Sequence, residues 1–391
     1  MKLMTHPLFD YETEGYRRVK GAALAFVRAM KIGQQPGCYR KEAGGEASFY
    51  GSYHALHVLD IFDELRNLPD SDREDWADRI REDQSEHGFF ADSAERRAKR
   101  LSLDELEPLW HYTRGHLWAL RILDRTPRYP LAFLEPLLEP GELYRWVKHY
   151  NWANSWAAAN QVLACATALL AARDWFGAGD ADTALRQGMF PALEELLDDR
   201  TGFWGTQFGA DLPNGLFGTI HIAPIYFALG WPLRAVVRNV DSTLACQLAD
   251  GSFWPGGSDC PDFDGAYMMS NLWEITGYRR DCLQSAARRY LDHALMHMSP
   301  DGCGWLLHRR DSRPEEWKSR PHWIWKPGAA DAVAEYRDED PARTRIMLGS
   351  WFYPLSIALV AHMLRDTGYE GPYRLNPRSL HQCNVFSTED A

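Results

Sequence analysis

Several features that define large functional classes are missing from this chain of 391 residues. No run of 18 uninterrupted apolar residues occurs, so we expect no transmembrane span, although peripheral membrane contact stays open. Neither a Gly-x-x-x-x-Gly-Lys-Ser/Thr phosphate loop nor a Gly-x-Ser-x-Gly nucleophile elbow is present. Long alternation of apolar and polar residues is also lacking, which argues against a fold rich in β-strands.

Basic charge is sparse as well. The chain has 43 Lys and Arg against 54 Asp and Glu, which gives a net charge of -11 at pH 7. A short basic run at residues 96–100 fits a solvated helix face. We expect no nucleic-acid partner, because binding to phosphates requires a basic patch or stripe.

Cysteine usage favours a reducing environment. The seven cysteines are odd in number, and no Cys-x-x-Cys pair occurs. Cys165 and Cys246 lie in apolar helical stretches, as buried thiols do. The first residues show no apolar stretch with a cleavage site, so we expect no signal peptide. Together these features predict a cytoplasmic protein.

A glycine repeat runs through the chain. Six glycines, each followed within three residues by an aromatic or apolar residue, lie 51, 53, 61, 49 and 51 residues apart: Gly37, Gly88, Gly141, Gly202, Gly251 and Gly302. A repeat of this length accommodates two helices and two loops. Because a stacked hairpin buries its apolar face against its neighbours, the repeat predicts one all-α domain over residues 1–391. We expect an (α/α)6 toroid of six hairpins around a hollow axis.

Helical stretches separate the glycines. Six stretches are apolar nearly all round and are predicted to form a buried inner ring: residues 47–62, 111–123, 151–170, 217–230, 262–277 and 343–364. Three others carry charge on one face and suit an outer ring: residues 16–30, 192–197 and 285–298. Residues 321–327, an aromatic and basic stretch within an irregular loop at 309–327, are a candidate lid, and residues 371–391 are expected to form an extended tail.

Polar and aromatic residues open the predicted inner helices. If these helices all point the same way, their N-terminal ends meet at one mouth of the cavity. The candidate substrate-binding residues are Tyr53, His54, His111, Arg114, Asn154, Trp156, His221, Tyr226, Tyr267 and Trp351. The alternative is that some of them only cap helices, since Asn and Asp favour that position.

The fifth repeat resembles a known family. It begins Gln247-Leu-Ala-Asp-Gly251-Ser-Phe253-Trp254, which is similar to the Gln-x3-Gly-x-Trp repeat of squalene–hopene and related terpenoid cyclases. Residues 84–90 and 201–204 are degenerate copies. Protein prenyltransferase β subunits share the α-toroid. In the cyclases an Asp-x-Asp-Asp-Thr-Ala motif opens an inner helix, and the corresponding stretch here resembles it at residues 262–267.

This resemblance implies a reaction started by an acid. The general acid of the family corresponds to Asp264, and the last Asp of the motif is replaced by Gly265. We take Asp259, Asp262 and Asp264 as candidate catalytic residues, because carboxyl groups so close together share protons. The expected reaction is protonation of an alkene or epoxide of an isoprenoid, in a cavity whose aromatic faces stabilise the cation. Such a cyclase or isomerase requires no metal and no cofactor.

Three other interpretations stay open. Toroidal polysaccharide lyases show a stretch similar to the one around Tyr267, and a lyase or glycoside hydrolase would use Tyr267, His221 and Asn154 on a carbohydrate. A zinc site related to that of prenyltransferases would need Cys260 together with His221, and we expect none. The chain could also be a non-catalytic toroid that serves as a binding module.

Overall fold

The computed structural model describes residues 14–309, 311, 345 and 347–364. Helices dominate this part of the chain, which divides into two compact units. Among the described residues, the first unit comprises those up to 67 and those from 235 onward, and the second comprises 68–234. The predicted all-α fold class is confirmed. The prediction of one domain over residues 1–391 is not tested and stays a prediction.

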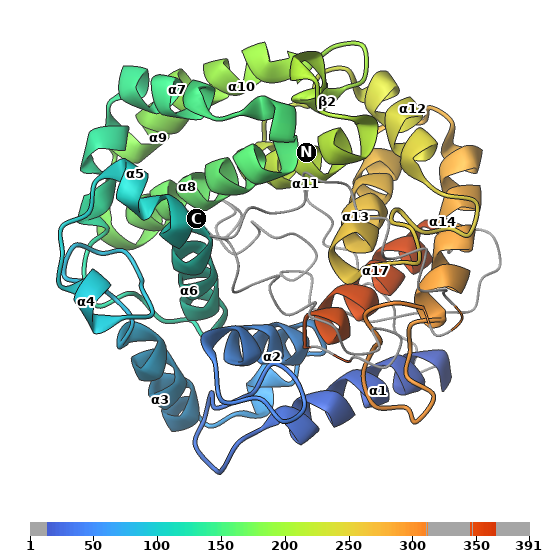
Figure 1. Ribbon diagram of the computed structural model, residues 1–391, viewed down its shortest axis with the longest axis horizontal. Helices are drawn as coiled ribbons and strands as arrows, with labels where there is room; N and C mark the ends of the chain where they lie inside the picture. Colours follow the sequence, from blue (N-terminus) through green and yellow to red (C-terminus); the bar gives the residue numbers. More distant parts are fainter. Residues whose placement is uncertain (1–13, 310, 312–344, 346, 365–391) are drawn as a thin grey trace. The chain divides into compact units, whose positions relative to one another are not determined.

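The first unit contains three long helices that are largely buried and three that are amphipathic (Figure 1). The buried helices are α2 (Phe49–Ile61), α13 (Asp259–Ile275) and α17 (Met347–Leu364). The amphipathic helices are α1 (Glu14–Met30), α12 (Val236–Cys246) and α14 (Arg280–Leu295). Helix α17 packs against both α2 and α13, and α14 packs against α17 and α13. Each buried helix is apolar on nearly every side, which is why it has neighbours on several sides.

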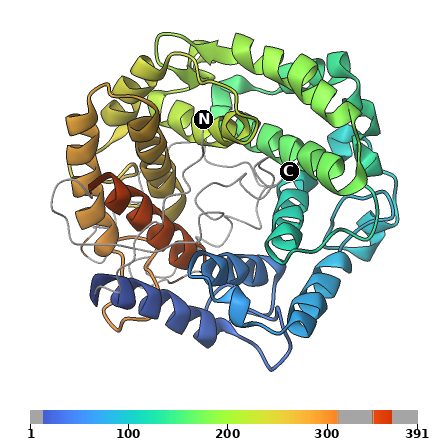
Figure 2. The ribbon, with the colours of Figure 1, turned by 180° about the vertical axis from the view of Figure 1, so that it is seen from behind.

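The second unit repeats this scheme. Its buried helices are α6 (Trp110–Ile122), α8 (Ser155–Phe176) and α11 (Leu212–Ala228). Helix α8 packs against both α6 and α11, and the α8–α11 pair is seen from behind in Figure 2. Partner helices are α3 (Asp70–Arg81), α7 (Pro140–His149) and α10 (Phe190–Leu196), with short helices α4 (Ala94–Arg97), α5 (Leu103–Leu106) and α9 (Asp180–Ala184). Strands β1 (Leu197–Asp198) and β2 (Phe203–Trp204) pair antiparallel, with Leu197 opposite Trp204.

The predicted helices are found within a few residues of their expected bounds. All six buried stretches and the three amphipathic stretches correspond to helices of the right character. The candidate lid at 321–327 and the predicted tail at 371–391 both lie outside the described residues.

Five of the six repeat glycines adopt the left-handed backbone conformation. Their φ values are 72° at Gly37, 95° at Gly88, 73° at Gly202, 92° at Gly251 and 70° at Gly302. These turns follow an amphipathic helix and reverse the chain toward a buried helix, and only glycine adopts such a φ without strain. Gly141 differs from the other five because it lies in the first turn of α7.

The Gln-x3-Gly motif has a structural role in both of its copies. Gln84 donates from Nε2 to the carbonyl oxygens of Gly88 and Tyr129, at 3.3 and 2.8 Å. Gln247 donates in the same way to Gly251 and Ala286, at 3.0 and 2.9 Å. Each glutamine side chain therefore links its glycine turn to a neighbouring segment by hydrogen bonds. The motif accounts for the architecture and does not by itself indicate a reaction.

Within the part of the chain that the structure describes, two segments are long and apolar enough to span a membrane by length and composition alone, Trp152–Phe176 and Met347–Leu364. In the structure 89% and 94% of their most apolar windows are buried within the protein. Their apolar character is therefore accounted for by packing against neighbouring helices.

Candidate functional site

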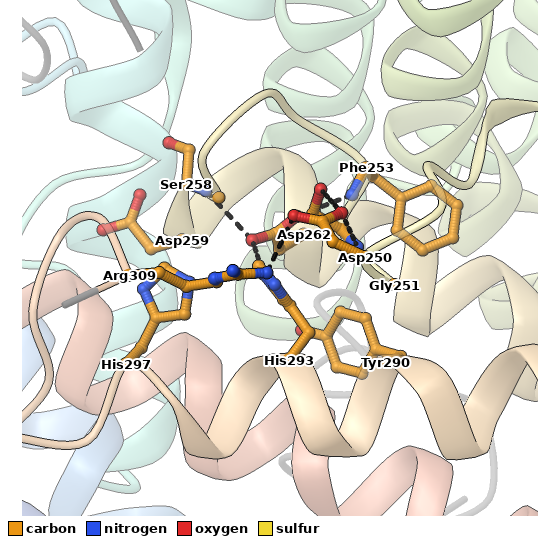
Figure 3. A network of polar contacts seen from close by, with 12 residues as sticks. Asp250, Gly251, Phe253, Ser258, Asp259, Asp262, Tyr290, His293, His297 and Arg309 are labelled. Carbon is orange, nitrogen blue, oxygen red and sulfur yellow. Dashed lines mark hydrogen bonds and ion pairs between the residues drawn. The ribbon is translucent and has the colours of Figure 1, made fainter. Parts of the chain in front are cut away.

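The start of α13 holds a buried carboxylate, Asp262, with four hydrogen-bond donors around it, and Figure 3 labels three of their residues, Phe253, Ser258 and His293. Asp262 accepts from the backbone N–H groups of Phe253 at 2.8 Å and Ser258 at 2.9 Å, both in the loop before the helix. It also accepts from His293 Nε2 at 2.8 Å and from the Tyr353 hydroxyl at 3.3 Å. Asp262 thus joins the loop, α14 and α17 to the first turn of α13.

Two histidines four residues apart lie beside this carboxylate, His293 in the last turn of α14 and His297 just beyond the end of that helix (Figure 3). His297 Nε2 lies 3.2 Å from His293 Nε2 and 3.2 Å from the Tyr353 hydroxyl, while its Nδ1 contacts the Leu306 carbonyl at 3.1 Å. One ligand atom each from Asp262, His293 and His297 lies within 4.8 Å of the others, so these are residues that could hold a metal ion. All three are buried.

Asp264 lies two residues beyond Asp262 and therefore on another face of α13. Helical spacing places it on the same face as Cys260 and Asn271, which are both half-buried, whereas Asp264 itself is 1% exposed. Burial, reinforced by the charges of Asp262 and Asp259, raises the pKa of Asp264 well above its usual value. Asp259 is also buried and accepts the Cys260 backbone N–H at 2.8 Å.

A cluster of aromatic rings and histidines joins α2 to α17. The rings of Tyr53 and His54 each lie 5.8 Å from the ring of Trp351, and His57 stacks on Trp351 at 3.9 Å. Burial and the nearby Lys41 lower the pKa of His54 to about 3. Burial, helped by His54, also holds the pKa of His57 well below its usual value. Both imidazoles are consequently neutral at physiological pH.

In the second unit, three neighbouring buried helices each contribute one polar residue. Arg114 of α6 donates from Nη1 to Asn160 Oδ1 of α8 at 2.7 Å. His221 of α11 contacts the Phe217 carbonyl through Nδ1 at 2.7 Å, which leaves Nε2 as a lone-pair acceptor when the ring is neutral. Burial and the charge of Arg114 lower the pKa of His221 to about 3, so the ring stays neutral.

Aromatic side chains lie one helical turn from each of these polar residues. Trp156 precedes Asn160 on α8 and packs against Phe217, with ring centroids 5.2 Å apart. The Arg114 guanidinium lies 4.8 Å from the Trp118 ring of its own helix. We call this set, Arg114, Trp118, Trp156, Asn160, Phe217 and His221, the polar-aromatic face of the second unit.

The remaining predicted binding residues lie elsewhere within their units. Asn154 caps α8, accepting from the Ala157 backbone N–H, and also accepts from Asn214. Tyr226 donates its hydroxyl to Glu194 of α10 at 2.7 Å. His111 is half-buried in the first turn of α6. Tyr267 is fully buried, with its ring near Phe263.

The structure adds four residues that the sequence analysis did not select: His57, Asn160, His293 and His297. The first three each contact a selected residue, and His297 contacts His293. The sequence did contain a signal for His293 and His297, because histidines four residues apart lie on one face of a helix. Asn160 had no comparable signal, since its partner Arg114 is 46 residues away in sequence.

Taken together, these sites belong to an all-α protein of paired helices with buried histidine, carboxylate and arginine groups. No protein-family profile matches the chain, and no curated protein matches it. Among solved structures it is similar to the GH76A alpha-1,6-mannanase of Salegentibacter sp. HEL1_6, with 11% identity and a TM-score of 0.47 over 90% of this chain and 100% of that one. An inactive variant of that enzyme in complex with alpha-1,6-mannotetrose matches with 10% identity, a TM-score of 0.47, and coverage of 90% of this chain and 99% of that one.

Proposed function

We propose that this protein is a carbohydrate-active enzyme that holds a sugar substrate on the polar-aromatic face of the second unit. The observation that carries the proposal is the convergence of Arg114, Asn160 and His221 from three adjacent helices, next to indole rings. Sugars offer hydroxyl groups that donate and accept hydrogen bonds, together with C–H faces that pack on aromatic rings.

The chemistry of these groups suits hydroxyl recognition. Arginine and the asparagine amide supply donors, and a neutral His221 supplies an acceptor at Nε2, for which the described residues offer no hydrogen-bond partner. A pKa of about 3 makes His221 a poor general base at neutral pH, so we assign it to binding rather than to proton abstraction. The positive charge of Arg114 favours sugars that carry a carboxylate.

The polar residues of this face are buried but keep a small solvent-exposed fraction. Arg114 and His221 are each 6% exposed, and Asn160 and Trp156 are each 8% exposed, while Trp118 and Phe217 of the same face are 2% and 0% exposed. Burying these polar groups against a hydrocarbon would cost roughly 1–3 kcal/mol for each group left unpaired. A hydrophilic substrate therefore suits this face better than the isoprenoid expected from the sequence resemblance.

The test is a panel of neutral oligosaccharides, including alpha-1,6-linked mannooligosaccharides, and uronate-containing ones. Calorimetry reports binding, new reducing ends report hydrolysis, and absorbance of the unsaturated product reports elimination. Arg114→Gln should weaken binding about 10- to 100-fold, because a hydrogen bond from a charged group contributes roughly 1.5–3 kcal/mol. Arg186→Gln, in the same unit but with an exposed guanidinium that pairs with Asp182, is the control and should leave the affinity unchanged.

The panel also discriminates between the other interpretations. Turnover of a glycan supports the proposal, and binding without turnover would replace the enzyme by a binding module. Cyclisation of a polyprene together with failure to bind any glycan would overturn the proposal in favour of the isoprenoid hypothesis.

A further inference from the structure

The carboxylate and two imidazoles at the start of α13 form a compact set of metal-binding atoms in the first unit. Asp262 Oδ2 lies 2.8 Å from His293 Nε2, which lies 3.2 Å from His297 Nε2, and all three atoms are within 4.8 Å of one another. We propose that Asp262, His293 and His297 bind a zinc ion that ties α13 to α14. The proposal is independent of the carbohydrate site, which lies in the other unit.

The separations suit a small divalent ion. A point equidistant from the three atoms lies at most about 2.5 Å from each of them, while Zn²⁺ binds imidazole nitrogen and carboxylate oxygen at roughly 2.0–2.2 Å. Small side-chain shifts would close that difference. The Tyr353 hydroxyl lies 3.3 Å from Asp262 Oδ2 and 3.2 Å from His297 Nε2, so it offers a fourth ligand atom, and the second oxygen, beside the other three. Two nitrogens and oxygen ligands are a set that zinc accepts.

Hydrogen bonds from neighbouring groups orient two of the three proposed ligands, His297 and Asp262. The Leu306 carbonyl accepts from His297 Nδ1, which puts the proton on Nδ1 and aims the Nε2 lone pair at His293 Nε2. Two nitrogens facing each other at 3.2 Å need either a proton or a metal ion between them. The backbone N–H groups of Phe253 and Ser258 hold the Asp262 carboxylate in place, as outer hydrogen bonds do at metal sites.

The charge of the site also favours a cation. Asp262 is fully buried in the first turn of α13, so its carboxylate is the negative charge that a cation at this site would meet. The partners of Asp262 among the described residues are backbone N–H groups, an imidazole and a phenol, and none of these is a Lys or Arg. Buried carboxylates are normally paired or bound to a metal ion, so a divalent cation here would offset negative charge.

A glycine, Gly257, lets the backbone approach the two imidazoles closely. Gly257 has a φ of 78°, and a Cβ atom at this position would lie 2.4 Å from His297 Nε2 and 2.9 Å from His293 Cε1. The Gly257 carbonyl accepts from His308 Nδ1 at 2.6 Å, which fixes the loop close to the two imidazoles. Because the ligands come from separate segments and are fully buried, we expect the ion to bind as the chain folds.

Elemental analysis of the full-length protein, purified without chelators, tests the proposal. We expect near-stoichiometric zinc in the wild type and almost none in His293→Gln and His297→Gln. His116→Gln is the matched control, because His116 is also buried and lies 3.2 Å from a carboxylate, that of Asp83, with a tyrosine beside it but no second histidine. This control should keep its zinc, and equal zinc in all four proteins would overturn the assignment.

A second experiment on the wild type avoids variants that fail to fold. The protein is unfolded with chelator, dialysed, and refolded with Zn²⁺, with Co²⁺ or with neither ion. We expect a higher Tm with Zn²⁺ than without it, and visible cobalt d–d bands of a low-symmetry nitrogen and oxygen site. Refolding to the native circular dichroism spectrum with no metal uptake and no change in Tm would show that the cluster is a hydrogen-bonded network without an ion.

Discussion

Replacing His221 by glutamine should make the stability of the protein less dependent on pH. Burial and the charge of Arg114 on α6 lower the pKa of His221 to about 3, whereas a histidine in an unfolded chain has a pKa of roughly 6.5. The unfolded chain therefore takes up the proton more readily than the folded protein. The stability associated with neutral His221 is complete above pH 6.5 and is lost progressively as the pH falls toward 3.

The expected magnitude follows from these two pKa values. Between pH 7 and pH 5, linkage gives a loss of about 2 kcal/mol in the free energy of unfolding for one such histidine. Urea titrations followed by far-ultraviolet circular dichroism at both pH values measure the loss in the wild type and in His221→Gln. The variant should lose about 2 kcal/mol less than the wild type.

A second histidine provides an independent comparison. His54 also has a pKa lowered to about 3, by burial and by Lys41, and it lies in the other unit. His54→Gln should therefore reduce the pH dependence by a similar amount. If His221→Gln loses the same free energy as the wild type between pH 7 and pH 5, the conclusion that buried His221 is kept neutral is refuted.

Three further substitutions test the packing and the sites. Gly218→Ala should destabilise the second unit by about 1–3 kcal/mol, because a Cβ atom at this position would lie 1.9 Å from Ser155 Oγ, where α11 packs against α8. An unchanged calorimetric Tm would contradict this prediction. Gly257→Ala should abolish zinc binding, since its Cβ atom would lie 2.4 Å from His297 Nε2, and retained zinc would count against the proposed site. Asp264→Asn should reduce turnover of whichever substrate the panel identifies at least 100-fold if Asp264 is the acid, and a rate near that of the parent removes it from that role.

Local signals in the sequence were sufficient for the helices and their turns. Stretches that are apolar on every side predicted the buried helices, because such a stretch is stable only with neighbours all round. The Gln-x3-Gly pattern marked turns that the structure fastens through Gln84 and Gln247. The evenly spaced glycines misled in one case, since Gly141 lies inside a helix and makes no such turn.

These local sequence patterns did not predict which side chains are in contact in the folded protein. The sequence analysis placed Asp262 beside Asp264, yet its partners in space are His293 and Tyr353, which are 31 and 91 residues away. It selected Arg114 and His221 but not Asn160, whose side-chain oxygen accepts a hydrogen bond from Arg114. Contacts of this kind depend on how neighbouring helices are rotated about their axes, and residues far apart in the chain set that rotation jointly.

By itself the sequence determined that this chain is helical, where its long helices run, and that polar groups are carried on otherwise apolar helices. These properties follow from the identity and spacing of neighbouring residues, which act over one or two helical turns. Only the tertiary structure decided which buried histidines face a carboxylate and which face an arginine. Packing places one helix against another, and the chemistry of each buried group depends on the charges and hydrogen-bond partners brought to it from distant parts of the chain.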